Sequence, residues 1–306
     1  MIKKAIKQIL KKSGYTLIKE IREAPTGMSI VKVGNFDVSI NNNNGIKNCY
    51  LYYKDYGRQL LRITSFLARN YSDLEVIDVG ANLGDSVALI KSGADVPVIC
   101  IEGDKDILDR FKLNTSNFKN VKLIPTFLSD KKHEQDCEIT NKGHNLTITP
   151  SSSRNGTEKL YFSSIDTLLE ESVLNQRCKL LKIDTEGHDL KILRGSEKFL
   201  AEVKPTILFE FNRNNLDQLE KDPAQIFHWL LEKNYRKILF YESDGRFMFS
   251  SDLSDAQFIK QIFNYVDGKN SKIYYLDLIV FHADFSDKAN EFIKNEEIYR
   301  SSLDNN

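Results

Sequence analysis

The sequence is short of the residue types that mark several specialised classes of protein. Its four cysteines are scattered over 306 residues, and no pair has the spacing of a zinc or redox motif, so reduced thiols are the simple interpretation. Its 43 basic residues are balanced by 43 acidic ones, whereas a general nucleic-acid binder carries excess positive charge. No apolar run is long enough for a membrane span, and the N-terminus lacks the apolar core of a signal peptide. These absences favour a cytoplasmic globular protein that does not bind nucleic acid.

From Glu75 onward, short apolar strands alternate with helical segments. Strands are expected at 75–80, 96–103, 121–130, 178–184, 205–212, 235–243 and 272–282. Helices are expected to begin near Asp85 and to cover 104–116, 188–200 and 222–234. This alternation predicts an α/β fold, a mostly parallel sheet covered by helices on both faces. In such sheets ligands bind at the carboxyl ends of the strands.

Four segments depart from this rhythm. The stretch MIKKAIKQILKK at residues 1–12 places its apolar residues on one face of a basic amphipathic helix. We favour packing of this helix on the body or on a second subunit of a homo-oligomer, and weak docking on an anionic membrane surface is the alternative. Residues 31–40 alternate like a strand, and residues 56–70 follow a helical pattern. Residues 131–164 predict an insertion, a small hairpin with a polar loop near the site.

The stretch VIDVGANLGDSVALI, from Val76 to Ile90, joins the first of these strands to a helix through a glycine corner. Asp78 stands near the strand end, and Gly80 and Gly84 allow a tight turn and close approach of a ligand. The next strand ends in Glu102, 22 residues after Gly80, where an acid accepts hydrogen bonds from ribose hydroxyls. An ordinary strand-to-helix turn would explain the glycines alone, but with Glu102 they predict a cofactor that contains adenosine.

The charges at this corner favour S-adenosylmethionine over a dinucleotide. A dinucleotide site uses G-x-G-x-x-G, so that a pyrophosphate meets bare amides at the helix start. Here Asn82 replaces the middle glycine, and Asp85 stands where positive potential would be needed. Carboxylates at Asp78 and Asp85 would repel a pyrophosphate and suit a sulfonium cation, which argues against a nicotinamide dehydrogenase.

Six stretches in order between residues 74 and 212 together resemble the FkbM family of S-adenosylmethionine-dependent methyltransferases. They are VIDVGANLGDSVALI, VICIEGDKDILDRFKLN, IPTFLSD, SSIDTLL, LLKIDTEGHDLKILRGSEKFL and PTILFEFN. The family's usual EPNP is here EGDK, which leaves Glu102 in place. Its usual DVEGAE is here DTEGHD, at residues 184–189, which puts His188 beside the expected reaction centre.

The resemblance implies a class I methyltransferase fold, a Rossmann-like sheet of seven strands whose last strand, here 272–282, runs antiparallel. It implies an N-terminal extension at 1–70 for substrate or oligomer contacts and a methyltransferase domain at 71–306. By position, Asp78, Gly80, Asn82 and Gly84 would line the methionine half of the cofactor, and Glu102 would hold the ribose. Ser129 and Asp130 would lie near the adenine. Members of the family resemble one another in methylating hydroxyl groups, often on sugars or polyketide-type metabolites.

Methyl transfer to an alcohol needs alignment and a base that takes the hydroxyl proton. His188 suits the role of base near neutral pH, although it would equally suit a helix-start residue that only packs or caps. Asp184 and Glu186 are the other catalytic candidates, since Asp184 ends a buried strand. Asp184, Glu210 and Asn212 end neighbouring strands and would offer oxygen ligands to Mg²⁺, or would hydrogen-bond the substrate, which we favour.

Two other classes of protein fit the sequence less well. Amino-group methyltransferases of nucleic acids commonly carry an acid or Asn, two prolines and an aromatic residue after the fourth strand, and none of the six prolines here adjoins another. A non-catalytic cofactor-binding subunit would not need the acids of the site. The preferred acceptor is a bacterial surface glycan or glycolipid precursor, and a small secondary metabolite is the alternative. Aromatic residues such as Tyr50, Tyr52, Tyr53 and Trp229 would suit a sugar face or ordinary packing.

Overall fold

The structure is a computed structural model that describes residues 27–142, 145–151, 158–185, 187–212, 225–267, 273 and 275–304. The predicted helix at residues 1–12 and the candidate Glu186 lie outside the described residues. Within this part of the chain, no helix combines the length and the apolar character that a bilayer crossing requires.

A central sheet of eight strands, in the order β13-β12-β14-β11-β10-β3-β4-β5, forms the middle of the described chain. The strands are β3 (Glu75–Val79), β4 (Val98–Ile101), β5 (Val121–Ile124), β10 (Cys178–Ile183), β11 (Thr206–Asn212), β12 (Tyr235–Tyr241), β13 (Phe247–Asp252) and β14 (Tyr275–His282). β3, β4, β5, β10 and β11 pair in parallel, and β14 runs antiparallel to β11 and β12. The predicted mostly parallel sheet with an antiparallel last strand is confirmed. The eighth strand, β13, forms a hairpin with β12 and was not predicted.

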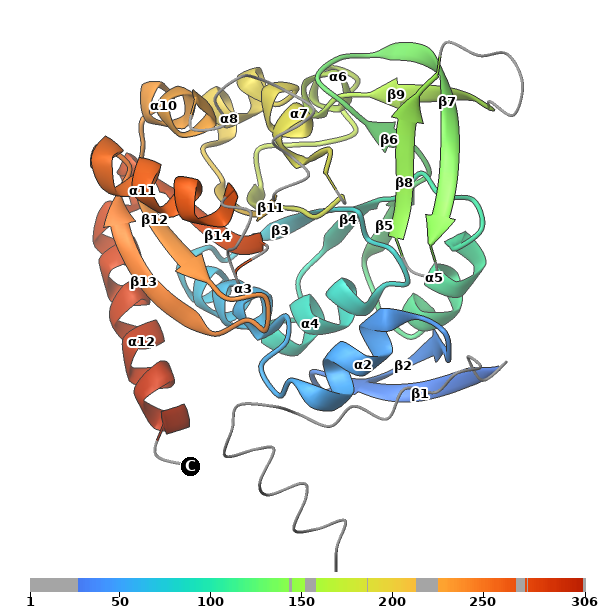
Figure 1. Ribbon diagram of the computed structural model, residues 1–306, viewed down its shortest axis with the longest axis horizontal. Helices are drawn as coiled ribbons and strands as arrows, with labels where there is room; N and C mark the ends of the chain where they lie inside the picture. The colour runs from blue at the N-terminus through green and yellow to red at the C-terminus, as the bar shows by residue number, and fades with distance from the viewer. Residues whose placement is uncertain are drawn as a thin grey trace, which may run out of the picture.

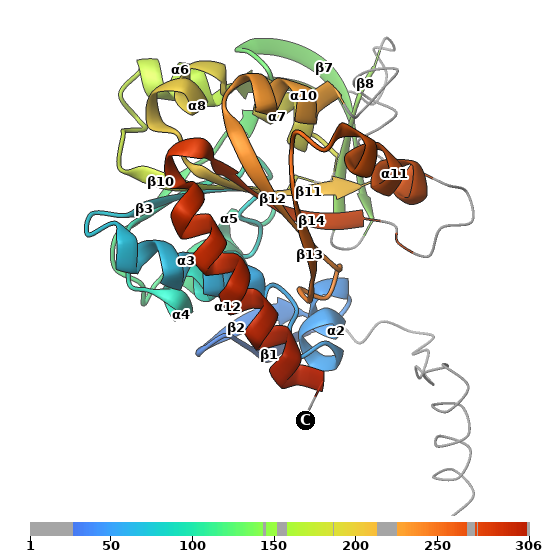
Figure 2. The same ribbon diagram turned by 90° about the vertical axis from the view of Figure 1, so that its left-hand side faces the viewer.

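Helices cover both faces of the sheet (Figures 1 and 2). One layer contains α3 (Arg58–Asn70), α4 (Asp85–Gly93), α5 (Leu108–Thr115) and α12 (Ser286–Asp304). The other contains α6 (Ile165–Glu170), α7 (Asp189–Arg194), α8 (Glu197–Val203), α10 (Gln225–Glu232) and α11 (Ala256–Asp267). Alternate strand residues enter the two cores: Ile77 packs with the second layer and Val76 with the first. A strand buried on both faces explains why the sequence shows continuous apolar runs here.

The single helix predicted at 188–200 is wrong, because the structure divides it into α7 and α8 around Gly195. A Cβ atom at residue 195 would lie 2.3 Å from the carbonyl oxygen of Ser129. Gly195 therefore lets the helix break against the segment that follows β6 (Phe127–Leu128).

The predicted insertion forms a second sheet with more strands than the one hairpin expected. Its strands β7 (His133–Lys142), β8 (Asn145–Pro150) and β9 (Glu158–Ser163) join β6 in the order β6-β9-β7-β8. Cys137, Ile148, Leu160 and Phe162 form its small core. In Figure 1 this sheet stands beside β4 and β5, at one end of the central sheet.

The N-terminal part begins with a hairpin, where the sequence predicted one strand. β1 (Met28–Val33) and β2 (Phe36–Asn41) pair antiparallel around Gly34, whose φ is +56°. A helix, α2 (Gly45–Tyr52), and the predicted helix, observed as α3, follow. Val33, Ile40 and Ile63 share one core with Val87 of α4. The division of the chain at residue 70 stays a prediction.

Candidate active site

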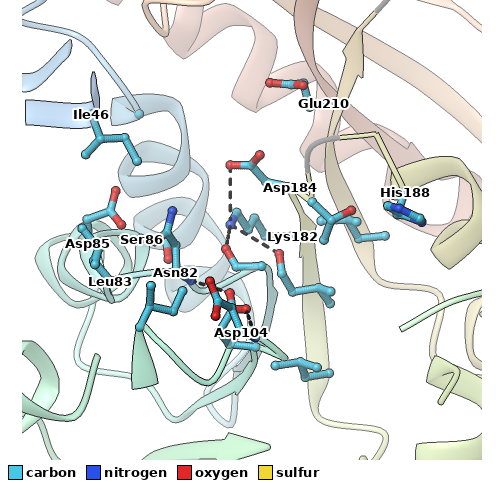
Figure 3. A pocket seen from close by; sticks show the side chains of 18 of the residues that line it. Ile46, Asn82, Leu83, Asp85, Ser86, Asp104, Lys182, Asp184, His188 and Glu210 are labelled. Atoms are coloured by element: carbon cyan, nitrogen blue, oxygen red, sulfur yellow. Dashed lines mark hydrogen bonds and ion pairs between the residues drawn. The ribbon is translucent and has the colours of Figure 1, made fainter. Parts of the chain in front are cut away.

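A cavity of 650 Å³ opens where β3, β4, β10 and β11 end (Figure 3). Four segments supply its wall: the loop after β3, the loop after β4, the loop after β10, and the N-terminal residues around α2. Residues of β6, of the insertion (Ile148 and Phe162), and of β11 and β14 also line it. Its position at the carboxyl ends of parallel strands is the one expected for a ligand site in this architecture.

The glycine corner is shaped by close backbone packing within the sheet. Gly80 has a φ of +72°, and a Cβ there would lie 1.9 Å from the carbonyl oxygen of Asp184. Only glycine lets the end of β3 touch the end of β10 so closely. Asn82 also adopts a positive φ, +44°, and its N–H donates to Glu102 at 3.0 Å. Both Gly80 and Asn82 line the cavity.

Glu102 lies half-buried on the cavity wall at the end of β4. One carboxylate oxygen accepts the N–H of Asn82 and the other accepts the N–H of Asp104, at 2.8 Å. Burial raises the pKa of Glu102, and the N–H of Asp104 opposes that change. Each oxygen keeps a further lone pair, so the carboxylate can accept the two hydroxyls of a ribose.

Asp78 is buried in the sheet, outside the cavity lining, with an exposed fraction of 0%. Its β10 partner in register is Lys182, which is also buried and whose ammonium lies 3.0 Å from one Asp78 oxygen. The hydroxyl of Ser86 donates to the other oxygen at 2.5 Å. The structure therefore gives Asp78 an internal cation as partner.

Lys182 connects the two sides of the cavity, and the sequence analysis did not single it out. Its ammonium donates to the carbonyl oxygen of Gly80 at 3.0 Å and lies 3.7 Å from Asp184. Although burial alone would lower its pKa, Asp78 and Asp184 raise it above the usual lysine range, so Lys182 stays charged. The signal was a lysine inside the otherwise apolar strand end LLKID.

Three other candidates for cofactor contacts lie outside the cavity lining. Gly84, with φ +83°, precedes α4 and faces Thr115 and Phe111 of α5. Ser129 is buried, and both it and Asp130 pack against Gly195. Their predicted roles beside the cofactor are not tested by this placement.

Asp85, the first residue of α4, lines the cavity and is held by the N-terminal part of the chain. The hydroxyl of Tyr50, on α2, donates to its carboxylate at 2.7 Å. Burial raises the pKa of Asp85, and the Tyr50 hydrogen bond opposes this. This contact fixes α2 beside the glycine corner.

Carboxylates also gather at the ends of β10, β11 and β14. Asp184 has a side chain that is 51% exposed, and Figure 3 shows it bridged to Lys182. Glu210 and Asp277 are cross-strand partners, and both line the cavity. Burial and the charge of Asp184 raise the pKa of Asp277 well above its usual range, while Gln59 donates to it at 2.7 Å.

No group of three metal-binding side chains suited to hold an ion occurs among the residues that the structure describes. Of the predicted magnesium ligands, Asp184 and Glu210 line the cavity. Asn212 ends β11, and its side chain lies outside the described part. The magnesium site stays a prediction.

His188 lies on the cavity wall just before α7, and its side chain makes no capping bond to that helix. Its Nε2 is 3.3 Å from the carbonyl oxygen of Ile148 on β8. Burial lowers the pKa of His188, which favours the neutral imidazole that a base requires. Asp189, fully buried below it, accepts the hydroxyl of Thr185 at 3.0 Å.

The charge of the cavity fits a cationic ligand. Seven carboxylates and one lysine line it among the described residues: Asp85, Glu102, Asp104, Asp106, Asp184, Glu210, Asp277 and Lys182. A cleft lined by one sign of charge concentrates ligands of the other sign. Together with the ribose-type carboxylate of Glu102, this wall fits S-adenosylmethionine and disfavours a pyrophosphate.

Several solved structures resemble the chain at low sequence identity and with TM-scores below 0.5. The crystal structure of methyltransferase FkbM from Methylobacillus flagellatus is 14% identical, with a TM-score of 0.41, and the match covers 68% of this chain and 44% of that chain. The fibrillarin pre-rRNA processing protein of Methanococcus jannaschii is 12% identical, with a TM-score of 0.40, over 87% and 86% of the two chains. An rRNA methylase from Streptococcus thermophilus is 12% identical, with a TM-score of 0.37, over 72% and 93%. The chain thus spans less than half the length of the first of these relatives.

No curated protein sequence matches the chain significantly. The family model of the methyltransferase FkbM domain matches residues 78–237, from the Asp78 of the glycine corner to β12. This match takes in just over half of the chain, including the end of β3 with the glycine corner, and β4, β10 and β11 with their loops. The chain therefore belongs to the FkbM family of S-adenosylmethionine-dependent methyltransferases.

Proposed function

We propose that the protein transfers the methyl group of S-adenosylmethionine to a hydroxyl oxygen of a sugar, a glycan or a glycolipid precursor. The observation that carries the proposal is that His188, whose pKa is lowered by burial, lines the same cavity as Asp184 and Glu102. Polar side chains at three strand ends, Asp184, Glu210 and Asp277, offer acceptors for several sugar hydroxyls. A polyol is the neutral ligand that best uses such a set of acceptors.

On the cofactor side, the residues of this chain would bind S-adenosylmethionine and orient it. Glu102 would accept the ribose hydroxyls, and the backbone around Gly80 and Asn82 would lie along the amino-acid portion. S-adenosylmethionine, when bound, supplies an electrophilic methyl carbon on a sulfonium. The negative charges that line the cavity attract that cation.

On the acceptor side, the residues hold a hydroxyl and move its proton. His188 would take the proton at a ring nitrogen as the oxygen attacks, which supplies roughly 10²–10⁴-fold of the rate. Asp184 would accept a neighbouring hydroxyl and fix the orientation of the sugar, and correct alignment can contribute several kcal/mol. Lys182 holds Asp184 beside the glycine corner.

A metal-assisted form of the same reaction has its own test. Magnesium held by Asp184 and Glu210 would lower the pKa of the acceptor hydroxyl. Activity that is unchanged after EDTA treatment would contradict the metal-assisted reaction. Activity that EDTA abolishes and Mg²⁺ restores would support it.

The test of the proposal is methyl transfer from S-adenosylmethionine to a panel of neutral and charged saccharides, followed by mass spectrometry. Addition of one methyl group to a hydroxyl is expected for at least one saccharide, and not with His188→Ala. Calorimetry with S-adenosylmethionine and NAD is the companion measurement, and only the first should bind. Methylation of amines or nucleic acids alone would contradict the proposal.

A further inference from the structure

A second cavity, of 390 Å³, lies beside the first one and is not used by the proposed reaction. It is bounded by β1 and its turn, by the segment between α2 and α3, by α4, and by the end of α12. Its lining consists of Lys32, Gly34, Tyr50, Tyr53, Lys54, Asp55, Tyr56, Arg58, Leu89, Tyr299 and Leu303.

The charge of this second cavity is opposite to that of the first. Three cationic side chains, Lys32, Lys54 and Arg58, line it beside one carboxylate, Asp55. The hydroxyl of Tyr299 donates to that carboxylate at 2.6 Å. Lys54 and Arg58 form no ion pair with any other residue in the described part of the chain, and Lys32 faces only an exposed Asp37 at 3.4 Å. An exposed pair of this kind contributes little, so the cations are available to a ligand.

Two tyrosines and Leu89 lie between the cavities and line both of them. The tyrosines are Tyr50 and Tyr56, and their rings meet edge to face with centroids 5.0 Å apart. Tyr50 is also bound to Asp85 on the side of the glycine corner. A ligand that passes this pair would have one end among carboxylates and the other among cations.

We propose that the second cavity binds an oxyanion, a phosphate or a carboxylate, carried by the acceptor outside the unit that is methylated. Arginine and lysine bind these groups through charge-assisted hydrogen bonds, and arginine binds them in a bidentate manner. The seven carboxylates of the first cavity would repel the same group. The acceptor is thus a saccharide with a neutral hydroxyl-bearing unit and an anionic group beside it. The acceptor part rests on the proposed function, but anion binding itself does not.

The experiment is calorimetric titration of the full chain with sodium pyrophosphate and, separately, with sodium citrate. We expect a Kd of about 1 mM or tighter for at least one of them, and the stronger of the two identifies phosphate or carboxylate as the group. The double variant Lys54→Gln/Arg58→Gln should weaken this binding at least about 10-fold, since it removes both unpaired cations. Lys122→Gln/Lys260→Gln changes the net charge equally at exposed positions on β5 and α11 and should leave binding unchanged.

Affinity for S-adenosylmethionine, measured on the same variants, shows that the fold is intact, because Lys54 and Arg58 do not line the first cavity. No binding of either anion, or equal weakening in both double variants, would overturn the proposal. Failure of every saccharide to accept a methyl group would count against the proposed function and leave the anion titration unaffected. The two ideas can therefore fail separately.

Discussion

The cofactor wall and the acceptor wall of the first cavity differ in how their polar groups are held. On the cofactor wall, both Glu102 oxygens accept backbone N–H groups and Asp85 accepts a tyrosine hydroxyl. On the acceptor wall, the Asp184 side chain is half-exposed and its nearest cation is 3.7 Å away. The cofactor wall is preorganised by hydrogen bonds from the loops after β3 and β4 and from α2. On the other wall, the exposed Asp184 side chain can be oriented by a ligand, so specificity among acceptors can vary there without loss of the fold.

Lys182 is the residue whose loss should damage both walls at once. Lys182→Met would leave Asp78 buried without its cation, which we expect to cost about 3–5 kcal/mol of stability. Urea unfolding at neutral pH measures this loss of stability. The double variant Asp78→Asn/Lys182→Met removes both charges and should recover much of the loss. If the free energy of unfolding of Lys182→Met lies within about 1 kcal/mol of the wild-type value, the Asp78–Lys182 ion pair does not stabilise the fold.

Changing His188 should affect the acceptor wall alone. His188→Ala should lower kcat by about 10²-fold or more, because the hydroxyl proton then has no base, while the Kd for S-adenosylmethionine stays the same. In the wild type, kcat should fall as the pH drops through the pKa of His188, which burial places below its ordinary value. His228→Ala, on the exposed side of α10, is the control. A near-normal rate for His188→Ala would mean that this residue only packs and is not the base.

Changing Glu102 should affect the cofactor wall alone. Glu102→Gln removes a charged acceptor for the ribose, so the affinity for S-adenosylmethionine should fall about 10- to 100-fold, or roughly 1.5–3 kcal/mol. Calorimetry measures this directly. Asp106→Asn also changes a carboxylate of the lining, but that residue is exposed and should have little effect. Equal losses in the two variants would mean that only the overall charge matters.

The smallest effect concerns Asp189, which supports the acceptor wall from below. Burial and the nearby Asp184 raise its pKa to about 6, so the folded state favours the protonated form. The stability that this group contributes is complete below about pH 4 and is lost as the pH rises from there through 6. Asp189→Asn keeps the shape, so its free energy of unfolding should match the wild type near pH 4 and exceed it by about 2 kcal/mol above pH 7.

The measurement for Asp189 is denaturant unfolding at a series of pH values. Asp109→Asn, which changes a carboxyl that is 99% exposed on α5, should show no pH-dependent difference from the wild type. A constant difference across the pH range for Asp189→Asn would contradict the linkage.

The strands that carry the site were predictable because each is a short apolar run that ends in polar residues. β3, β4, β10, β11 and β14 lie where the sequence predicts them, and Gly80, Asn82, Glu102, Asp184 and His188 do line one cavity. The predictions failed where contacts between distant residues, and not the local sequence pattern, determine the secondary structure. The break at Gly195 depends on contact with Ser129, and β13 exists because β12 offers it an edge.

By itself, the sequence determined the order of strands and helices, the glycine corner, and the carboxylates at the strand ends. These features depend on the spacing of apolar residues and on the residues that form turns, which are local properties of the chain. Only the tertiary structure decided which of these groups face a ligand. Strand register joins Asp78 to Lys182 inside the protein, whereas Asp184, two residues after Lys182, reaches the cavity. The folding of residues 27–70 around the glycine corner likewise created a second cavity of opposite charge from residues far apart in the chain.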